Sequence, residues 1–229
     1  MSPPPRRVPT CNLCGFPVLR LHGGDAGRRC RRCLSTFRHR AGGAVLRRLP
    51  LAPVAAVYEL SSRGALCRYL RRTFARVTVS ELFDGVPPGS FRGAVQCQDV
   101  QRLTYADRSF DLVTSTEVFE HVPDDGRAFA EIHRVLRAGG HLVFTVPLME
   151  AAPTLERARL ERGAIVHLVQ PEYHGDRLRG RGGVLAFRTY GPDIVGRLQA
   201  AGFEARLERI DDAAHAIAGG TVVVGRKPA

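Results

Sequence analysis

The segment from Gln98 to Pro147 constrains the fold more strongly than any other part of this 229-residue chain. It contains two apolar, β-rich runs of strand length, Phe110 to Thr116 and Leu142 to Val146. Between them, Pro123-Asp124-Asp125 supplies residues that start helices, and Gly139-Gly140 supplies residues that end them. The pattern therefore predicts two parallel strands joined by a helix, the repeating unit of an α/β sheet.

The predicted helix has one apolar face, because Phe129, Ile132 and Val135 recur at helical spacing. A right-handed crossover through this helix brings the ends of both strands to the same carboxyl edge of the sheet. The segment from Glu117 to His121 and Pro147 would then lie together at that edge. Open α/β sheets bind their ligands there, so the sequence predicts a crevice lined by polar side chains.

The same segment resembles the second half of a class I S-adenosylmethionine-dependent methyltransferase of the methyltransferase type 11-like group. The residues that carry the resemblance are Asp99, Ser109-Phe110-Asp111, Glu120-His121-Val122-Pro123-Asp124, Arg134-Val135-Leu136 and Gly139-Gly140. Each of these is a weak signal alone, whereas the ordered set is far more specific. The resemblance covers roughly residues 50 to 227 and implies an α/β, Rossmann-like sheet of about seven strands.

Apolar periodicity and turn residues place the expected elements along the chain. Strands are expected at residues 54–60, 76–81, 94–99, 110–116, 141–146, 205–210 and 221–225, the last two as a closing hairpin. Helices are expected at residues 64–74, 125–137 and 192–201. A further, basic helix is expected at residues 38–49, interrupted at Gly42-Gly43.

Four of the six cysteines lie near the amino terminus, as Cys11-x2-Cys14 and Cys30-x2-Cys33 with fifteen residues between the pairs. Two pairs at this spacing are typical of a four-thiolate tetrahedral zinc site. Two disulfides are the alternative, which a reducing cytosol disfavours. Four thiolates leave no coordination position for water, so Zn²⁺ is expected to be structural and to supply folding energy.

We expect four regions in the chain. Residues 1–10, rich in proline and arginine, are expected to be a disordered tail, residues 11–37 a zinc ribbon, and residues 38–53 a connecting helix and linker. Residues 54–229 are expected to form the methyltransferase domain. Within it, residues 150–189 lack a regular pattern apart from an arginine-rich helical piece, and the resemblance implies that this insertion caps the substrate pocket.

The formal net charge of +12 is concentrated near the amino terminus. Residues 1–50 contain eleven arginines and one acid, Asp25, whereas the remaining 23 basic and 21 acidic residues nearly cancel. A basic end suits a polyanionic partner, although arginine enrichment also follows from GC-rich codon usage. The chain lacks an apolar run of the ~20 residues that cross a bilayer, and residues 1–10 lack the apolar segment typical of a signal peptide. A cytoplasmic protein with no membrane partner is expected.

The resemblance implies roles for residues at the strand ends. The first strand is closed by the acid Glu59, and Ser61-Ser62-Arg63-Gly64 replaces the family's glycine-rich turn, with Gly64 alone retained. Serine tolerates a positive φ poorly, so cofactor binding could be weakened or lost at this turn. The resemblance implies an S-adenosylmethionine site with Glu59, Ser61 and Gly64 at the first turn, which has to admit the methionine end, and with Glu81 and Leu82 at the ribose. Asp99 and Val100 would lie at the adenine, and Thr116, Glu117 and Val118 on the reactive side. A nicotinamide dinucleotide is disfavoured because the turn lacks GxGxxG.

Two histidines are the candidate catalytic residues. Methyl transfer from a sulfonium is an in-line displacement, so alignment supplies much of the catalysis and a base is optional. If the acceptor is a hydroxyl or a protonated amine, a histidine can remove its proton. His174 and His121 are the candidates for this role, and a purely structural role is open for each.

The sequence leaves three functions open. The first choice is methyl transfer to an oxygen or nitrogen of a small molecule or glycan, because Ser35 to Arg40 resembles bacterial ribbon-containing methyltransferases of unassigned substrate. The second is an rRNA or tRNA methyltransferase. In that case phosphates would be gripped by Arg28, Arg29, Arg31, Arg32, Arg38 and Arg40, although aromatic residues for base stacking are sparse. The third is a non-catalytic methyltransferase-like binding protein with an altered first turn. The oligomeric state is open.

Overall fold

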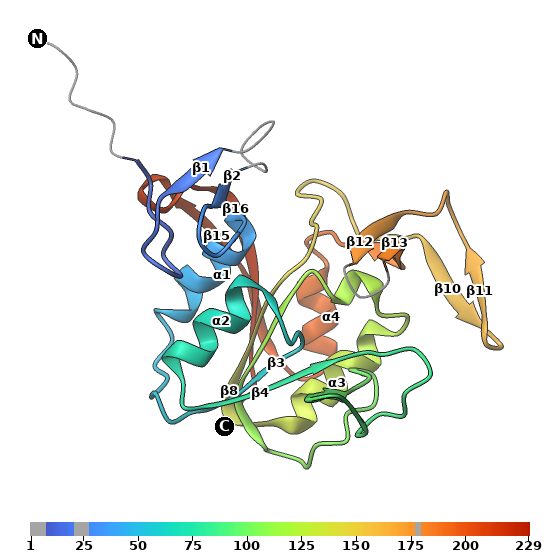
Figure 1. The fold of residues 1–229 in the computed structure, drawn as a ribbon. Coiled ribbons are helices and arrows are strands. Elements are labelled where there is room, and N and C mark those ends of the chain that lie inside the picture. Colours follow the sequence, from blue (N-terminus) through green and yellow to red (C-terminus); the bar gives the residue numbers. More distant parts are fainter. Residues whose placement is uncertain (1–7, 21–27, 177–179) are drawn as a thin grey trace, which may run out of the picture.

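The computed structural model describes residues 8–20, 28–176 and 180–229, and one mixed sheet forms its centre (Figure 1). Within these residues the sheet has eight strands, in the order β15-β16-β8-β7-β3-β4-β6-β5. Their bounds are β3 Ala56–Glu59, β4 Arg76–Glu81, β5 Phe91–Arg92, β6 Val95–Cys97, β7 Phe110–Thr116, β8 Leu136–Thr145, β15 Glu204–Asp212 and β16 Ile217–Arg226. β8, β7, β3, β4 and β6 are parallel, and β16, β15 and β5 run antiparallel to their neighbours. The expected α/β Rossmann-like class is confirmed, with β5 as an additional short edge strand.

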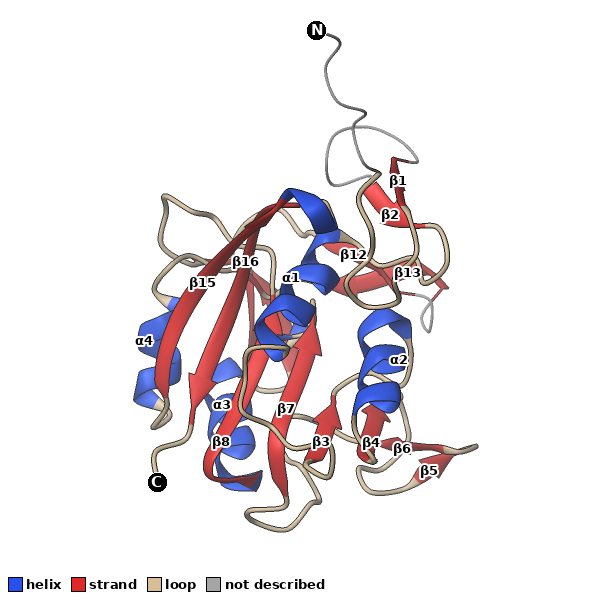
Figure 2. Ribbon diagram, turned by 90° about the vertical axis from the view of Figure 1, so that its left-hand side faces the viewer, coloured by secondary structure: helices blue, strands red, loops and turns tan. Residues whose placement is uncertain are grey.

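Helices cover both faces of the sheet (Figure 2). α1 (Phe37–Leu46) and α2 (Gly64–Thr73) pack on one face, and α3 (Asp125–Val135) and α4 (Ile194–Ala200) pack on the other. Successive residues of a strand point to opposite faces, so in β7 Leu112 joins the layer under α1 and α2 while Val113 joins the layer under α3. β3 and β7 are largely buried on both sides, and the carboxyl edge of the parallel strands remains open for a site.

α3 ends at Val135, two residues before the expected end, and Gly139-Gly140 lie inside β8. Gly139 has a φ of +75°, and a Cβ on Gly140 would lie 2.9 Å from the carbonyl oxygen of Arg137. The register between β7 and β8 shifts at the start of this segment. The prediction that these glycines end the helix is wrong, because they form an irregular, bulged start to the strand.

α1 runs without a break through Gly42-Gly43, so the interruption predicted there is also wrong. Gly43 faces the amino-terminal segment, where a Cβ would collide with the side chain of Leu13. Leu13 is buried in the same apolar cluster as Val45 of α1 and Leu70 of α2. The glycine therefore permits close packing of the cysteine-containing segment on the helix.

The cysteine-containing segment has a short antiparallel pair, β1 (Val18–Arg20) and β2 (Arg28–Cys30). Cys11, Cys30 and Cys33 belong to the same buried cluster as residues of α1 and α2. Residues 1–7 of the expected disordered tail lie outside the described residues. Thr10 is described, and its N–H donates to the carbonyl of Ala214 at 2.9 Å. The segment thus rests on the body formed by the central sheet and its helices.

The insertion folds as β hairpins, so the helical piece predicted there is wrong. Its antiparallel pairs are β10 (Ala158–Glu161) with β11 (Ala164–His167), β12 (Tyr173–Asp176) with β13 (Gly180–Leu185), and β9 (Leu155–Glu156) with β14 (Arg188–Thr189). Arg162 and Gly163, between β10 and β11, have φ values of +49° and +84°. Two successive positive φ angles form the tight turn that suits a two-residue hairpin.

None of the helices in the described part of the chain has the length and apolar character that a membrane crossing requires.

Candidate functional site

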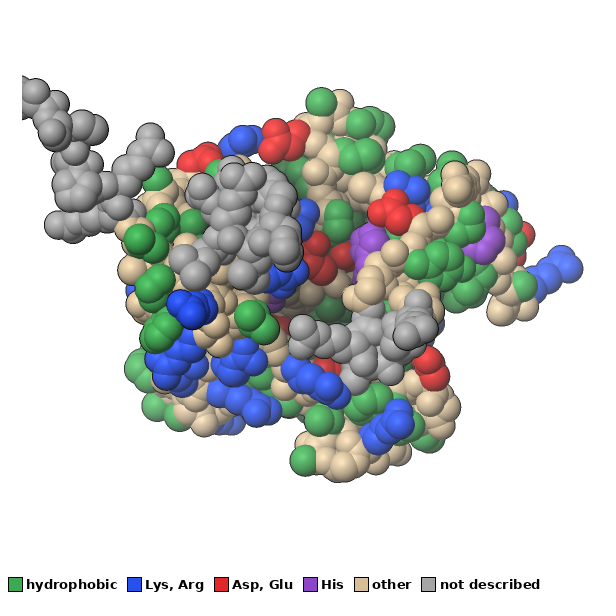
Figure 3. Space-filling view, turned by 45° about the horizontal axis from the view of Figure 1, so that its top comes forward, with side chains coloured by type: hydrophobic (Ala, Val, Ile, Leu, Met, Phe, Trp, Pro, Cys, Tyr) green, Lys and Arg blue, Asp and Glu red, His purple; other side chains and the backbone are tan. Residues whose placement is uncertain are grey.

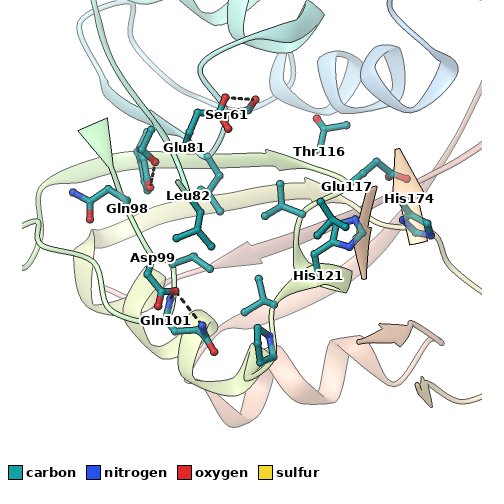
Figure 4. Close-up of a pocket in the computed structure, with 18 of the residues that line it drawn as sticks. Ser61, Glu81, Leu82, Gln98, Asp99, Gln101, Thr116, Glu117, His121 and His174 are labelled. Atoms are coloured by element: carbon teal, nitrogen blue, oxygen red, sulfur yellow. Dashed lines mark hydrogen bonds between the residues drawn. The ribbon is translucent and has the colours of Figure 1, made fainter. Parts of the chain in front are cut away.

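A cavity of ≈ 290 Å³ opens at the carboxyl edge of β3, β4, β6 and β7 (Figure 4). The loops after these strands and the β12–β13 hairpin of the insertion form its walls. The sequence-predicted residues in its lining are Ser61, Glu81, Leu82, Asp99, Val100, Thr116, Glu117, Val118, His121 and His174. Of the predicted residues, Glu59 and Gly64 lie outside this lining. The sheet therefore brings most of the predicted set to one place.

Glu59 lies at the end of β3 and is only 1% exposed. Its Oε2 accepts a hydrogen bond from the hydroxyl of Thr114 in β7. Burial raises the pKa of Glu59 to about 8, and the Thr114 hydrogen bond opposes this rise. Glu59 is thus mostly protonated at neutral pH and links two strands.

The Ser61–Gly64 turn folds back onto Glu81. Glu81 Oε1 accepts hydrogen bonds from the Ser62 N–H at 2.9 Å and from Ser62 Oγ at 2.7 Å. Gly64 begins α2 with a φ of +102°, which explains a glycine at this position. Ser61 and Ser62, by contrast, both have a negative φ. The two serines therefore carry no strain from a left-handed backbone.

Asp99 lies at the opposite end of the cavity from His174 (Figure 4). Its Oδ1 accepts hydrogen bonds from the Gln101 N–H at 2.9 Å and from Gln101 Nε2 at 3.0 Å. Gln101 lines the cavity and was missed by sequence reasoning, as was Tyr58, whose hydroxyl lies 2.7 Å from Ser80 Oγ. Strand alternation could have identified Tyr58, since it fixes which side of β3 each residue faces.

Two histidines and two glutamates meet at the other end of the cavity. The ring centroids of His121 and His174 are 4.8 Å apart. Glu120 Oε1 lies 3.8 Å from His121 Nε2 and 3.7 Å from His174 Nδ1. Glu120 is fully buried, whereas Glu117 lines the cavity. Sequence reasoning named Glu120 only as part of a motif, and the structure places it next to the insertion, where its carbonyl oxygen accepts a hydrogen bond from the Phe187 N–H at 2.7 Å.

The glutamates and histidines at this end of the cavity shift one another's pKa values. The neighbouring Glu120 carboxylate, 3.7 Å from His174 Nδ1, and then Glu172, 3.0 Å from His174 Nε2, raise the pKa of His174 to about 9. Burial, followed by the charge of Glu120, raises the pKa of Glu117 to about 7, and the Arg38 guanidinium at 3.6 Å opposes that rise. His174 is thus protonated at neutral pH in this arrangement.

The arginines near the cysteines divide into a buried one and exposed ones. Arg40 is fully buried and donates hydrogen bonds to the carbonyl oxygens of Ser35 at 2.7 Å and Ala216 at 2.8 Å. The expectation that Arg40 grips phosphates is therefore wrong. Arg29, Arg31 and Arg32 are exposed, and the side chain of Arg28 lies outside the part of the chain that is described.

The four amino-terminal cysteines form one cluster. The Sγ atoms of Cys11 and Cys33 are 3.6 Å apart, those of Cys14 and Cys30 are 3.3 Å apart, and all four lie within 4.8 Å of one another. All four are free thiols, so the disulfide alternative has no support here. Metal–sulfur bonds of about 2.3 Å place tetrahedral sulfurs about 3.8 Å apart, which is compatible with the separations in this cluster.

The part of the sequence that forms much of this cavity is similar to known methyltransferases. Residues 60–144 match the methyltransferase domain family. Over 87 residues the chain is 36% identical to the sarcosine/dimethylglycine N-methyltransferase of Halorhodospira halochloris, covering 35% of this chain and 29% of that protein. Over 50 residues it is 40% identical to the ubiquinone biosynthesis O-methyltransferase of Coxiella burnetii, covering 22% of this chain and 21% of that protein. The chain thus spans less than a third of the length of either relative.

Solved structures extend the resemblance to most of the chain. An S-adenosylmethionine-dependent methyltransferase from Mesorhizobium loti superposes with a TM-score of 0.52 at 20% identity, covering 80% of this chain and 96% of that one. At that identity the likeness establishes the fold alone. Together with the family match, it supports a class I methyltransferase fold. The cysteine cluster and the hairpin insertion lie outside the residues that match the family.

Proposed function

We propose that the chain is an S-adenosylmethionine-dependent methyltransferase that acts on an oxygen or nitrogen of a small molecule or glycan. One observation carries the proposal: Glu81 and Asp99, at the carboxyl ends of neighbouring parallel strands, line the same cavity as the His121–His174 pair. Two carboxylates can accept hydrogen bonds from the two polar ends of an adenosine. The small-molecule N- and O-methyltransferases among the relatives support the acceptor class.

In this proposal the ribose hydroxyls bind Glu81 beside Leu82, and the adenine amino group binds Asp99 beside Val100. Ser62 already donates two hydrogen bonds to Glu81 Oε1, so the ribose would share or replace them. The methionine end would lie near Ser61 and Gly64. Its methyl group would face Thr116, Glu117 and Val118, toward the histidines.

His174 and His121 are the proposed proton-handling residues. His174 has a raised pKa and begins in its protonated form, so it serves as a base only after losing that proton. Alignment of acceptor, methyl carbon and sulfur therefore has to supply much of the rate. The β12–β13 hairpin, which carries His174, would close the acceptor side and exclude water.

Zn²⁺ is the metal proposed for the cysteine cluster. Four sulfurs with near-tetrahedral spacing fit it, and Cys11 Sγ lies 3.2 Å from Ser35 Oγ while the Cys33 N–H points to Cys30 Sγ at 3.5 Å. Such outer hydrogen bonds stabilise thiolate charge and orient ligands. With four protein ligands the zinc would be structural.

Calorimetric titration with S-adenosylmethionine and S-adenosylhomocysteine tests the cofactor assignment. We expect both to bind, and Glu81→Gln and Asp99→Asn each to weaken binding at least tenfold. Glu161→Gln, on exposed β10, is the matched control and should bind as the wild type does. Lack of cofactor binding by the folded wild-type protein would contradict the proposal and favour the non-catalytic alternative.

RNA methylation is the second candidate, favoured by the exposed Arg29, Arg31 and Arg32. Figure 3 shows basic side chains gathered on a face that also carries a hollow containing acidic and histidine side chains. Phosphate contacts release counterions, so RNA binding should fall steeply with salt and weaken when Arg31 and Arg32 are changed to glutamine. RNA binding that does not depend on salt would remove this candidate.

A further inference from the structure

The carboxylate of Glu120 lies in an environment that is unfavourable for an uncompensated negative charge. Its side chain is fully buried, and neither carboxylate oxygen has a hydrogen-bond partner among the described residues. Separations of 3.7 and 3.8 Å from the two histidine nitrogens are too long for hydrogen bonds. An ionised group buried in this way is strongly unfavourable unless a cation compensates it. A protonated His174 is one such cation, and a metal ion held by both histidines in place of that proton is another.

The far nitrogen of each histidine is already fixed by another group. His121 Nδ1 lies 2.8 Å from the carbonyl oxygen of Leu185, which can only accept, so Nδ1 carries a proton. In the neutral ring, Nε2 then turns its lone pair toward Glu120. His174 is held in the same manner, with Nε2 bonded to Glu172 and Nδ1 facing Glu120. Outer hydrogen bonds of this kind are the usual means of orienting metal-binding histidines.

The spacing of the donor atoms suits one ion. The facing atoms of Glu120, His121 and His174 all lie within 4.8 Å of one another. Bonds of about 2.1 Å place neighbouring ligands about 3 Å apart and opposite ligands about 4.2 Å apart, so only small side-chain shifts are needed. We propose that Glu120, His121 and His174 bind a divalent cation at the acceptor end of the cavity. Two imidazoles favour Mn²⁺, Fe²⁺, Co²⁺ or Zn²⁺ over Ca²⁺.

A three-residue site leaves coordination positions open toward the cavity, where Glu117 also has an oxygen, Oε1, without a hydrogen-bond partner. Resting on the proposed methyltransferase function, this site specifies a hydroxyl acceptor. A bound cation lowers the pKa of a coordinated hydroxyl, whose proton passes to solvent. A lone pair of the oxygen then forms the bond to the methyl carbon as the carbon–sulfur bond breaks. The electron pair of the broken bond stays on sulfur, which becomes a neutral thioether. The two histidines then act as ligands.

Titration of the full-length protein with MnCl₂, with free Mn²⁺ measured by electron paramagnetic resonance, tests the site. Mn²⁺ is chosen because it prefers oxygen and nitrogen donors to the four thiolates. We expect one Mn²⁺ per chain, and at least tenfold weaker binding in Glu120→Gln and in His174→Ala. His167→Ala, an exposed histidine on β11 of the same insertion, is the matched control and should bind as the wild type does. No binding at millimolar Mn²⁺, or wild-type binding by Glu120→Gln, would overturn the site.

Thermal unfolding supplies a second readout. Mn²⁺ should raise the midpoint of the wild type and of His167→Ala but leave that of Glu120→Gln unchanged. If His174→Ala does not fold, Glu172→Gln replaces it, since it removes only the group that orients His174, and weaker Mn²⁺ binding is again expected. A parallel titration with S-adenosylmethionine separates the two proposals. Cofactor binding without Mn²⁺ binding overturns only the cation site, and Mn²⁺ binding without cofactor binding overturns only the methyltransferase.

Discussion

At the scale of single residues, burial decides which strand-end acids can meet a ligand. Glu59 and Glu81 each end a parallel strand and are indistinguishable by sequence position. Glu81 lines the cavity, whereas Glu59 is buried against Thr114 with a pKa raised to about 8. Sequence could predict acids at these positions because parallel strands share one edge. It could not predict their different environments, because those depend on how β7 and the Ser61–Gly64 turn pack against them.

The raised pKa of Glu59 makes folding stability depend on pH. Because the folded pKa of about 8 exceeds the usual value of 4.5, the neutral carboxyl favours folding below about pH 4.5, and this contribution is lost as pH rises to about 8. Glu59→Gln imitates the neutral form. Between pH 5 and pH 8 the wild type should therefore lose stability relative to Glu59→Gln, by on the order of a few kcal/mol.

Urea unfolding of both proteins at several pH values measures this difference. Glu161→Gln, which changes a half-exposed carboxylate on β10, controls for the loss of one negative charge. Parallel stability profiles for the wild type and Glu59→Gln would show that Glu59 is ionised in the folded protein.

At the scale of elements, regular periodicity was predictable and turn geometry was not. β4 and β7 have the bounds expected from their apolar residues. The insertion was misjudged because its hairpins depend on the positive φ of Arg162, a residue that seldom adopts that conformation, and on contacts such as that of Arg188 with the Val122 carbonyl at 2.6 Å. Long-range contacts of this kind leave no local pattern in the sequence.

Asp124 belongs to the helix-starting residues predicted from the sequence, and the structure confirms that it caps α3. It precedes α3, and its Oδ1 accepts a hydrogen bond from the Arg127 N–H at 2.9 Å. Asp124→Ala leaves this helix N–H without its cap and should destabilise the protein by about 1 kcal/mol, whereas Asp124→Asn should cost much less. Chemical denaturation measures both changes. Equal destabilisation by alanine and asparagine would rule out capping as the reason.

At the scale of the whole molecule, the cysteine segment and the sheet share one apolar layer. Leu13 and Cys30 are buried in the cluster that contains Val45, Leu70 and Val224. Arg68 and Arg72 of α2 also donate hydrogen bonds to the carbonyls of Cys33 at 2.6 Å and Leu13 at 2.8 Å. These two arginines therefore join the cysteine segment to α2.

This shared layer predicts that loss of the proposed zinc site lowers the stability of the whole protein. Cys33→Ser should lower the thermal midpoint by roughly 5–10 °C in one cooperative transition, because a loss of about 3 kcal/mol shifts a domain of this size by about that much. Near-ultraviolet circular dichroism of tyrosine is the suitable probe, since the first tyrosine is Tyr58 and the signal reports on the methyltransferase-like body alone. Arg31→Met, an exposed change in the same segment, should leave the midpoint unchanged. An unaltered tyrosine transition in Cys33→Ser would mean that the cysteine segment unfolds independently, despite the core that it shares with α1 and α2.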